Sequence, residues 1–283
     1  MMMRVDVPKA DSLRAAVRVA GEDTRTASRL LAEEVPVALV FDGSTQAVMM
    51  ASPIDLEDFA LGFALTEAII AGSDEIEQID ILPQTLGDDE TGIELRIRLA
   101  SPAGEALARR RRSMAGPLGC GLCGLESLEE ALRDVPLRRS PVPAFTMRSL
   151  MEAPDRLRDG QSLHDRTRAV HAAGFLTPRD GMVLLREDVG RHNALDKLIG
   201  ALRQRGLDAA EGAVVLTSRI SVDMVQKSAM AGCPVLVSPS APTALAVRLA
   251  ERAGIVLAAY AQGGSIDILS NRDQLMEGPC DVA

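Results

Sequence analysis

The second half of the chain alternates short apolar runs with stretches of helical periodicity. The runs have the length of buried strands, and the stretches between them place their apolar residues on one helical face. The runs cover 181–185, 213–217, 234–238 and 255–260, and the helical stretches cover 191–204, 221–230 and 242–252. Helices of this length can act as crossovers between strands of one sheet. The alternation predicts an α/β fold with a largely parallel or mixed sheet.

The first half has a different pattern, in which a hairpin precedes a helix and further strands. Residues 35–41 and 45–50 flank Asp42-Gly43-Ser44, where glycine supplies the positive φ of a turn. Ser52 and Pro53 have the composition of a helix N-terminus, with Ser52 as the cap. The other elements expected here are a helix ending at Gly72, strands at 76–82 and 93–99, and a helix over 103–113.

These patterns divide the chain into four segments. With 283 residues, 47% of them apolar, it can bury one large core or two modest ones. The expected segments are an N-terminal extension over 1–30, a small α+β domain over 31–113, a loop and proline-containing linker over 114–145, and an α/β domain over 146–283.

The charge of the chain narrows the classes of partner. The formal net charge is −9, so the protein as a whole lacks the positive field that attracts nucleic acid or anionic membranes. Any anion must therefore be bound by a local site. Because the chain has no Trp and one Tyr, it offers few platforms on which bases could stack. There is no export-signal pattern and no apolar run near ~18 residues. We expect a cytoplasmic protein that neither binds nucleic acid nor spans a membrane.

Cys120 and Cys123 lie in a glycine-rich stretch that is expected to be a loop. Four cysteines are too few for a disulfide framework in a chain of this length. Structural zinc normally takes two ligand pairs, whereas Cys233 and Cys280 stand alone and the histidines show no paired spacing. A thioredoxin-like pair would begin a helix directly after a strand. The pattern favours a nucleophilic or sulfur-carrying loop, and a redox pair, a zinc switch or a plain turn stay open.

Arg109 to Arg112 precede this stretch. Cationic neighbours lower the pKa of a thiol and raise its thiolate fraction. Arginines at a helix C-terminus also complement the helix dipole without any functional role. The sequence leaves both interpretations open.

Three strand-to-helix turns of the second half have polar side chains. The carboxyl ends of parallel strands meet at one sheet edge, so we expect these turns to lie together. They contain Arg191 and His192 in the block 186–197, Arg219 in the turn 218–221, and Ser240 and Thr243 in the turn 238–243. Their hydroxyl, guanidinium and N–H groups suit an anionic ligand, and they also suit plain helix caps and a charged turn with internal ion pairs. The polar residues of the block 186–197 are expected at the strand end and on the exposed helix face.

Two further features are ambiguous. His171-Ala172-Ala173 has the spacing of the H-x-E motif of zinc deaminases but lacks its Glu, and no P-C-x-x-C follows, which argues against hydrolytic deamination. A single histidine in an apolar segment is expected to be a core residue. Gly263-Gly264 indicates either a close approach of the backbone to a ligand or a hairpin turn.

Several long motifs, in order, resemble the formate dehydrogenase accessory sulfurtransferases, the FdhD family. The matching segments are 49–53, 55–63, 186–200, 218–227 and 240–246, with Cys-Gly-Leu-Cys-Gly at 120–124. The resemblance extends from about residue 30 to residue 275 and is far more specific than the cysteine pair alone. It implies a cytidine-deaminase-like three-layer C-terminal domain and a smaller α+β N-terminal domain, in a homodimer.

The resemblance also implies a function. A member of this family accepts persulfide sulfur from a cysteine desulfurase. It passes the sulfur to the molybdenum of the bis(molybdopterin guanine dinucleotide) cofactor, which is then inserted into formate dehydrogenase. By position, Cys120 would form the persulfide and Cys123 would be its partner thiol. A second hypothesis is a non-catalytic chaperone that binds cofactor and apo-enzyme, with the cysteine pair only shaping a loop.

The resemblance places the guanine-nucleotide end of the cofactor after the last apolar run. The residues expected there are Tyr260, Ala261, Gln262, Gly263, Gly264 and Ser265, together with Arg191, His192, Arg219, Ser240 and Thr243. The family commonly has Arg or Lys in this segment, where the chain has Gln262 and Ser265, so Arg191 or Arg219 would supply the positive charge. GDP or GTP would serve as a soluble mimic of the cofactor. No structural metal is expected.

Overall fold

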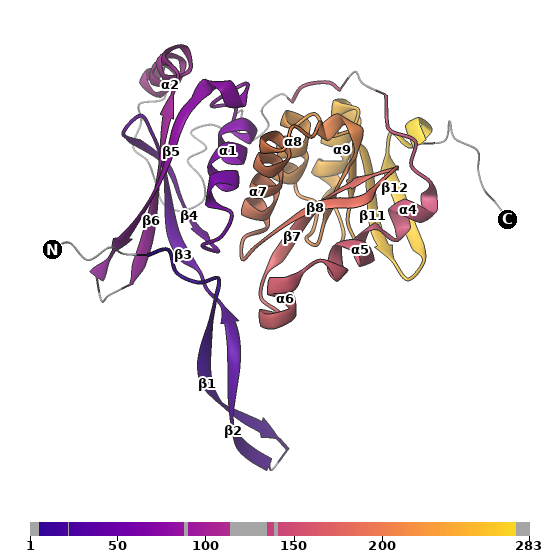
Figure 1. Cartoon of the computed structure of the whole chain (residues 1–283). Helices are drawn as coiled ribbons and strands as arrows, with labels where there is room; N and C mark the ends of the chain where they lie inside the picture. Colours follow the sequence, from indigo (N-terminus) through magenta and orange to yellow (C-terminus); the bar gives the residue numbers. More distant parts are fainter. Residues whose placement is uncertain (1–5, 22, 88–89, 114–134, 139–140, 276–283) are drawn as a thin grey trace.

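The computed structural model describes residues 6–21, 23–87, 90–113, 135–138 and 141–275. It shows a hairpin arm, a small α+β part and a larger α/β part (Figure 1). Cys120 and Cys123 lie outside the described residues, as do residues 125–133, where the sequence predicts a short helix, and the side chains of Arg109 to Arg112. Within the described residues, no helix is long and apolar enough to cross a membrane.

The small part is a four-stranded sheet with one face covered by a helix. The strands are β3 (Val35–Phe41), β4 (Ser44–Ala51), β5 (Ile76–Thr85) and β6 (Thr91–Leu99), in the order β4-β3-β6-β5. Alternate residues of β3 and β6 pack against α1 (Leu56–Thr66), and α2 (Ser101–Ser113) follows β6. The hairpin turn has φ of 46° at Asp42 and 76° at Gly43, so the left-handed turn predicted from glycine is confirmed.

The predicted start of α1 was wrong by three residues. The helix begins at Leu56 after Asp55, and the Ser52 side chain caps no part of it. Ser52 is instead fully buried, and its backbone N–H donates to Asp188 Oδ2 at 3.0 Å. The local pattern predicted Ser52 as a helix cap, but Ser52 forms its hydrogen bonds with Asp188 and Val189, which are far away in the sequence. The helix also ends at Thr66, before the predicted Gly72.

The large part is a six-stranded sheet with helices on both faces. Its strands are β7 (His171–Thr177), β8 (Gly181–Asp188), β9 (Ala213–Leu216), β10 (Val235–Val237), β11 (Val256–Gln262) and β12 (Ser265–Ser270). Their order is β12-β11-β10-β9-β7-β8, in which β9, β10 and β11 are parallel and the outer pairings are antiparallel. The predicted mixed sheet is confirmed for this part. Its likeness to a cytidine deaminase stays a prediction.

The helices cover the two faces of this sheet in separate groups. The helices are α7 (Arg191–Gln204), α8 (Val222–Met230) and α9 (Ala244–Ala253) on one face, and α4 (Met147–Met151) and α5 (Ala153–Asp159) on the other, with α6 (Ser162–Thr167) after α5. Short 3-10 turns lie at Ser73–Glu75, Ala209–Glu211 and Arg272–Leu275. Strand β9 shows the alternation, because Val214 packs toward α7–α9 and Val215 toward α4 and α5.

Several elements were not predicted. They are the arm strands β1 (Asp11–Ala20) and β2 (Asp23–Ala32), helices α4 to α6, and strands β7 and β12. The arm has no buried residue among those described, so it has no burial pattern to detect. Strand β7 is buried on both faces and contains alanine and glycine, which gives neither an alternating pattern nor high strand propensity.

Helices α1 and α7 join the small and large parts, and they meet through glycines. A Cβ added to Gly62 would lie 1.7 Å from the carbonyl oxygen of Asp196, and one added to Gly200 would lie 1.9 Å from that of Asp58. No real Cβ contact is that short, so only glycine fits at either position. The two backbones therefore approach as closely as helices can, which fixes how α1 sits on the large part.

Candidate functional site

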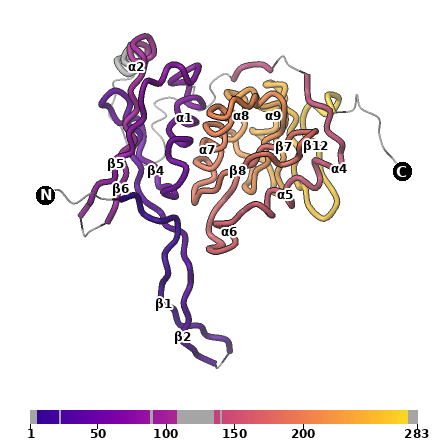
Figure 2. The backbone as a smooth tube through the Cα atoms, viewed as in Figure 1, coloured from indigo at the N-terminus to yellow at the C-terminus, as the bar shows by residue number. Residues whose placement is uncertain are grey.

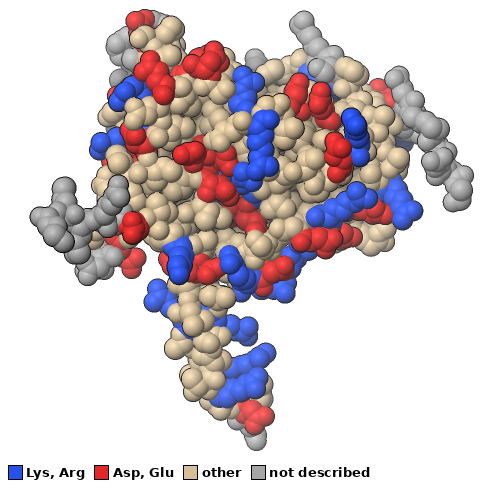
Figure 3. All heavy atoms as spheres, in the orientation of Figure 1, with Lys and Arg blue, Asp and Glu red and all other residues tan. Residues whose placement is uncertain are grey.

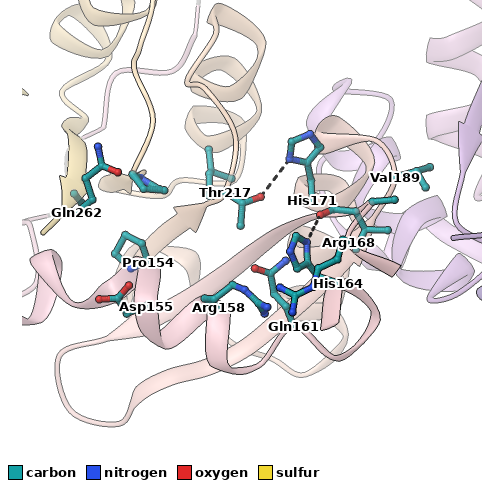
Figure 4. A pocket seen from close by; sticks show the side chains of 15 residues that line it. Pro154, Asp155, Arg158, Gln161, His164, Arg168, His171, Val189, Thr217 and Gln262 are labelled. Atoms are coloured by element: carbon teal, nitrogen blue, oxygen red, sulfur yellow. Dashed lines mark hydrogen bonds between the residues drawn. The ribbon is translucent and has the colours of Figure 1, made fainter. Parts of the chain in front are cut away.

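A cavity of about 560 Å³ lies at the carboxyl edge of the parallel strands. The first residues after β9, the loop after β10 and the end of β11 form one wall, through Thr217, Pro239 and Gln262. Helices α5 and α6 form the other wall (Figure 4). The volume is in the range of small-molecule sites, and this sheet edge is where α/β folds place ligands.

The cavity wall contains two of the three histidines of the chain. His171 is half-buried, and its Nδ1 lies 3.3 Å from Thr217 Oγ1 (Figure 4). Its expected place in the core was therefore wrong. His164 Nδ1 donates to the carbonyl of Val170 at 3.1 Å. Burial, and then the positive charges of Arg191, His164 and His192, lower the pKa of His171 below its ordinary value of 6.5. His171 is therefore neutral at physiological pH and can both donate and accept a hydrogen bond.

Gln161 adds a donor that has no protein partner. Its side chain is 1% exposed and lines the cavity, yet among the described residues no acceptor lies within reach of its Nε2. Buried amide groups are nearly always paired, with protein, water or ligand. Two arginines, Arg158 and Arg168, lie on the same wall. Arg158 is paired with Asp165 at 2.5 Å, and Asp155 also lines this wall, so Arg168 and the Gln161 donor are the groups that suit an anion here.

The neighbouring turn after β8 is held by a buried ion pair. Lys197 Nζ lies 2.6 Å from Asp188 Oδ2, and both side chains are inaccessible to solvent. The other oxygen of Asp188 accepts from Gly190 N at 2.7 Å and from Asn193 Nδ2 at 3.0 Å. Burial lowers the pKa of Lys197, against the opposing effect of Asp188. The expectation that the polar residues of α7 lie on its exposed face was wrong, because Asp196 and Lys197 are buried.

This network ties the turn to the small part of the protein. Lys197 Nζ donates to the carbonyl of Ser52 at 2.8 Å, and Val189 N donates to Ser52 Oγ at 3.1 Å. Nearby, Lys227 Nζ lies 2.9 Å from Asp196 and from Glu67, and Arg186 Nε lies 2.7 Å from Asp58. The position of the turn therefore depends on α1 and on the strand before it.

Arg191 and His192 follow directly on this turn, at the N-terminus of α7. Arg191 Nε, His192 Nε2 and Ser221 Oγ are buried atoms without a hydrogen-bond partner among the described residues. His192 Nε2 is 3.7 Å from Asp223 Oδ2, which suits an ion pair but exceeds hydrogen-bond distance, and His192 lowers the pKa of Asp223. Ser221 precedes α8 without capping it. Arg191 Nε and Ser221 Oγ are therefore unused donors beside two helix N-termini, next to the pair of His192 and Asp223.

The segment 260–265 reaches the cavity with two of its residues. Ala261 and Gln262 line the wall, where a β-bulge with φ of 53° at Tyr260 redirects the strand. Gly263 and Gly264, with φ of 61° and 76°, form the hairpin turn that leads into β12, and Ser265 follows them. Of the two interpretations of the glycine pair, the structure supports the hairpin turn.

The remaining predicted residues lie along the same edge in different roles. Thr243 Oγ1 accepts from Ala246 N at 3.2 Å and caps α9. Ser240 accepts from Tyr260 N through its carbonyl at 3.4 Å. Arg219 is exposed and does not line the cavity. The turns after β9 and β10 are neighbours, because Ser238 Oγ donates to the carbonyl of Ser218 at 2.7 Å, and the helix-cap interpretation holds for Thr243.

Comparison with known proteins settles the family. The model of the FdhD/NarQ family matches residues 32–276. The chain belongs to the FdhD/NarQ family. A protein named sulfur carrier protein FdhD from Agrobacterium fabrum is 50% identical over 251 residues, which is 89% of this chain and 91% of that protein. The sulfur carrier protein FdhD of Bordetella petrii is 43% identical, over 98% of this chain and 96% of its own length.

A solved structure shares the fold of this FdhD/NarQ protein. It is described as a formate dehydrogenase accessory protein from Desulfotalea psychrophila and aligns with a TM-score of 0.73 at 24% identity. The alignment covers 94% of this chain and all of the other. The mixed α/β architecture is therefore shared by a protein of low sequence identity.

Sequence reasoning missed part of the cavity of this FdhD/NarQ protein. Neither α5 nor α6 was predicted; Arg158 lies in α5, His164 lies in α6, and Gln161 and Arg168 flank α6. Glu187, from β8, accepts the N–H groups of Leu163 and His164 at 2.8 Å and thereby holds the start of α6. Because a distant strand caps this helix, no local cap pattern could have revealed it.

The one described cysteine of this FdhD/NarQ protein is unsuited to sulfur transfer. Cys233 is fully buried, and burial raises the pKa of its thiol to about 11. A thiol in this state is inert, because the thiolate is the nucleophile.

Proposed function

We propose that this chain is a sulfur carrier that forms a persulfide on Cys120 and delivers the sulfur to the molybdenum cofactor of formate dehydrogenase. The observation that carries the proposal is family membership combined with the Cys120-Gly-Leu-Cys123 sequence in a glycine-rich stretch. Relatives covering most of the chain are named sulfur carriers. The proposal places the chain in the cytoplasm, where thiols stay reduced.

The proposed loading step is a thiol exchange. The thiolate of Cys120 attacks the outer sulfur of a persulfide on a cysteine desulfurase, forms a new S–S bond and releases the desulfurase thiolate. No electrons enter or leave. Cys120 then holds the transferred sulfur as a persulfide.

The proposed release step uses the second cysteine. The thiolate of Cys123 attacks the inner sulfur of the Cys120 persulfide, which forms a Cys120–Cys123 disulfide and releases sulfide as the ligand for molybdenum. An external dithiol reductant then reduces the disulfide. The step gives Cys123 a role that differs from that of Cys120.

The cavity edge supports the proposal as the place where the anionic cofactor binds. The protein is acidic overall, and here two histidines and two arginines line a cavity with a buried donor, Gln161 Nε2, that has no partner among the described residues. The phosphates of a guanine dinucleotide would accept hydrogen bonds from these donors. Bis(molybdopterin guanine dinucleotide) is the cargo of this reaction, and a cavity of about 560 Å³ would take one nucleotide end of it.

Sulfur loading tests the mechanism directly. The protein is treated with a cysteine desulfurase and labelled cysteine, and the 114–133 peptide is analysed by mass spectrometry. We expect one added sulfur on Cys120, none in Cys120→Ala, and retained loading in Cys123→Ala with loss of sulfide release on addition of the cofactor. Loading and formate dehydrogenase maturation that survive in Cys120→Ala would refute the carrier role. If cofactor binding and formate dehydrogenase maturation both persist when Cys120 and Cys123 are replaced together, a non-catalytic chaperone is the better description.

Nucleotide binding tests the cavity independently of the cysteines. Gln161→Leu should leave the free energy of unfolding unchanged or raise it, because it removes a buried donor that has no partner. If Nε2 serves the ligand, the same change should weaken GDP binding by about fivefold to tenfold. Isothermal titration with GDP and GTP measures this effect.

Two further variants calibrate the titration. Arg168→Gln removes a charge at the cavity and should weaken GDP binding by about tenfold or more. Arg179→Gln removes an exposed arginine that does not line the cavity and should change nothing. Unchanged GDP affinity in both Gln161→Leu and Arg168→Gln would show that the nucleotide binds elsewhere.

A further inference from the structure

A second cavity, of about 320 Å³, lies at the amino edge of the parallel strands, opposite the first cavity. Three of its lining residues, Ala210, Cys233 and Ile255, lie just before β9, β10 and β11. The segment 135–138 runs past α8 and α9 here (Figure 2), and it contributes three more lining residues. The volume is at the lower end of the range for small-molecule sites. The two cavities share no lining residue.

Arg138 is a cation of this cavity that lacks a counter-ion in the described chain. Its Nε donates to the carbonyl of Gly254 at 2.9 Å, and its Nη2 donates to Gln274 Oε1, and both acceptors are neutral. Its Nη1 is buried and has no hydrogen-bond partner among the described residues. Burial lowers the pKa of Arg138 below its ordinary value, as desolvation does when no carboxylate compensates it. The guanidinium is therefore held in place with one donor left over.

Asp208 supplies the opposite charge in the same cavity. Its Oδ1 accepts from Ala210 N at 2.9 Å and caps the 3-10 turn Ala209–Glu211. In the part of the chain that the structure describes, its other carboxylate oxygen has no partner, and no ion pair joins Asp208 to Arg138. The cavity thus holds a cation and an anion apart from each other. Buried apolar side chains form much of the remaining wall, through Ala229, Ala253 and Ile255.

This combination of charges discriminates between classes of ligand. A simple carboxylate would be attracted by Arg138 and repelled by Asp208, and a simple amine would meet the reverse. Figure 3 shows acidic and basic side chains mixed over the visible face of the large part, so no broad positive field there favours a polyanion. A small zwitterion with an apolar group satisfies both charges and the apolar wall.

We propose that this cavity binds an α-amino acid with a small apolar side chain. The carboxylate of the ligand accepts from Arg138 Nη1, and its ammonium group donates to the free oxygen of Asp208. The side chain of the ligand contacts the apolar wall at Ala253 and Ile255. The site is separate from the cavity assigned to the cofactor, so it does not depend on the function proposed above.

Isothermal titration of the full chain with L-valine and two truncated analogues tests the proposal. Isovalerate lacks the ammonium group of valine and isobutylamine lacks its carboxylate, while both keep the branched apolar end. We expect L-valine to bind with a Kd of about 0.1–1 mM, which is ordinary for a ligand of this size. Each analogue should bind at least about tenfold more weakly, because it loses a hydrogen bond between charged groups.

Asp208→Asn separates the two charges of the site. Asparagine can still accept from Ala210 N, so the turn keeps its cap while the negative charge is lost. L-valine should bind this variant at least about tenfold more weakly, whereas isovalerate should bind it more tightly than it binds the wild type. Arg138→Met should weaken the binding of both ligands at least about tenfold, and circular dichroism checks that it is folded.

Two controls restrict these effects to the second cavity. Arg179→Gln removes an exposed charge outside the cavity and should leave the Kd of L-valine unchanged. GDP binding should be the same in Asp208→Asn as in the wild type, since the two cavities share no lining residue. The proposal is overturned if L-valine does not bind at up to about 10 mM. Isovalerate that binds the wild type as tightly as L-valine, or an unchanged Kd for L-valine in Asp208→Asn, would also overturn it.

Discussion

Gly200→Ala is expected to lower the free energy of unfolding by about 3 kcal/mol, through overpacking between α1 and α7. The new Cβ would lie 1.9 Å from the carbonyl oxygen of Asp58, which is backbone and has no rotamer to change. In an ordinary helix interior the same substitution raises stability by about 1 kcal/mol. A decrease in the free energy of unfolding, rather than an increase, therefore identifies the close approach of α1 and α7. Urea denaturation followed by circular dichroism measures it.

The same argument predicts a loss in Gly62→Ala, whose Cβ would lie 1.7 Å from the carbonyl oxygen of Asp196. The matched control is Gly87→Ala, because a Cβ there meets nothing within 4 Å. We expect Gly87→Ala to be neutral. If Gly200→Ala stabilises the protein as it would an isolated helix, the described contact between α1 and α7 is incorrect.

Lys197→Met is expected to cost about 3–5 kcal/mol, because it leaves the Asp188 carboxylate buried without its cation. Both side chains are inaccessible to solvent, and Lys197 Nζ lies 2.6 Å from Asp188 Oδ2. Methionine keeps most of the length of the lysine side chain, so the lost packing is small and the unpaired charge dominates. Equilibrium unfolding in urea gives the difference.

A double-variant cycle isolates the pair. Asp188→Asn removes the charge, so adding it to Lys197→Met should restore part of the lost stability, and the two costs should not add. Arg205→Met, which removes an exposed charge, should change stability by less than about 0.5 kcal/mol. Additive effects of Lys197→Met and Asp188→Asn would mean that the two side chains do not interact.

The network around this pair also connects stability to the candidate site. Asp188 and Lys197 hold both Ser52, in the small part, and the turn that precedes Arg191. Displacing α1 would therefore displace Arg191 and His192. The small part therefore supports the edge of the large sheet. The residues that make this contact are too far apart in the sequence for a local motif to reveal it.

Local patterns located the elements whose burial follows a period. The hairpin at Asp42-Gly43, the alternating strand β6 and the helices α7 to α9 all have a repeating apolar face or a turn residue with a required φ. The same reasoning failed at Ser52, where a cap composition is used for a long-range bond. It also failed for α6, whose start is held by Glu187 rather than by a residue of its own.

Some residues of the candidate site could be predicted from the sequence, and others could not. Ala261, Gln262, Arg191 and His192 come from strand ends and helix starts, where the order of elements alone directs attention. His164 lies in a short helix with too few turns to show a period, and Gln161 lies directly before that helix. Their importance appears only when the cavity and the unpaired Nε2 of Gln161 are seen together.

The sequence by itself determined the α/β order of the second half, the hairpin of the first and the family, because these rest on short-range periodicity and ordered motifs. Only the tertiary structure decided which charges are buried. Asp188 meets the backbone of Ser52 across 136 residues, and Lys227 meets Glu67 across 160. Whether a charged residue lies in water or in an ion pair depends on what folds against it, and no neighbouring residue specifies that.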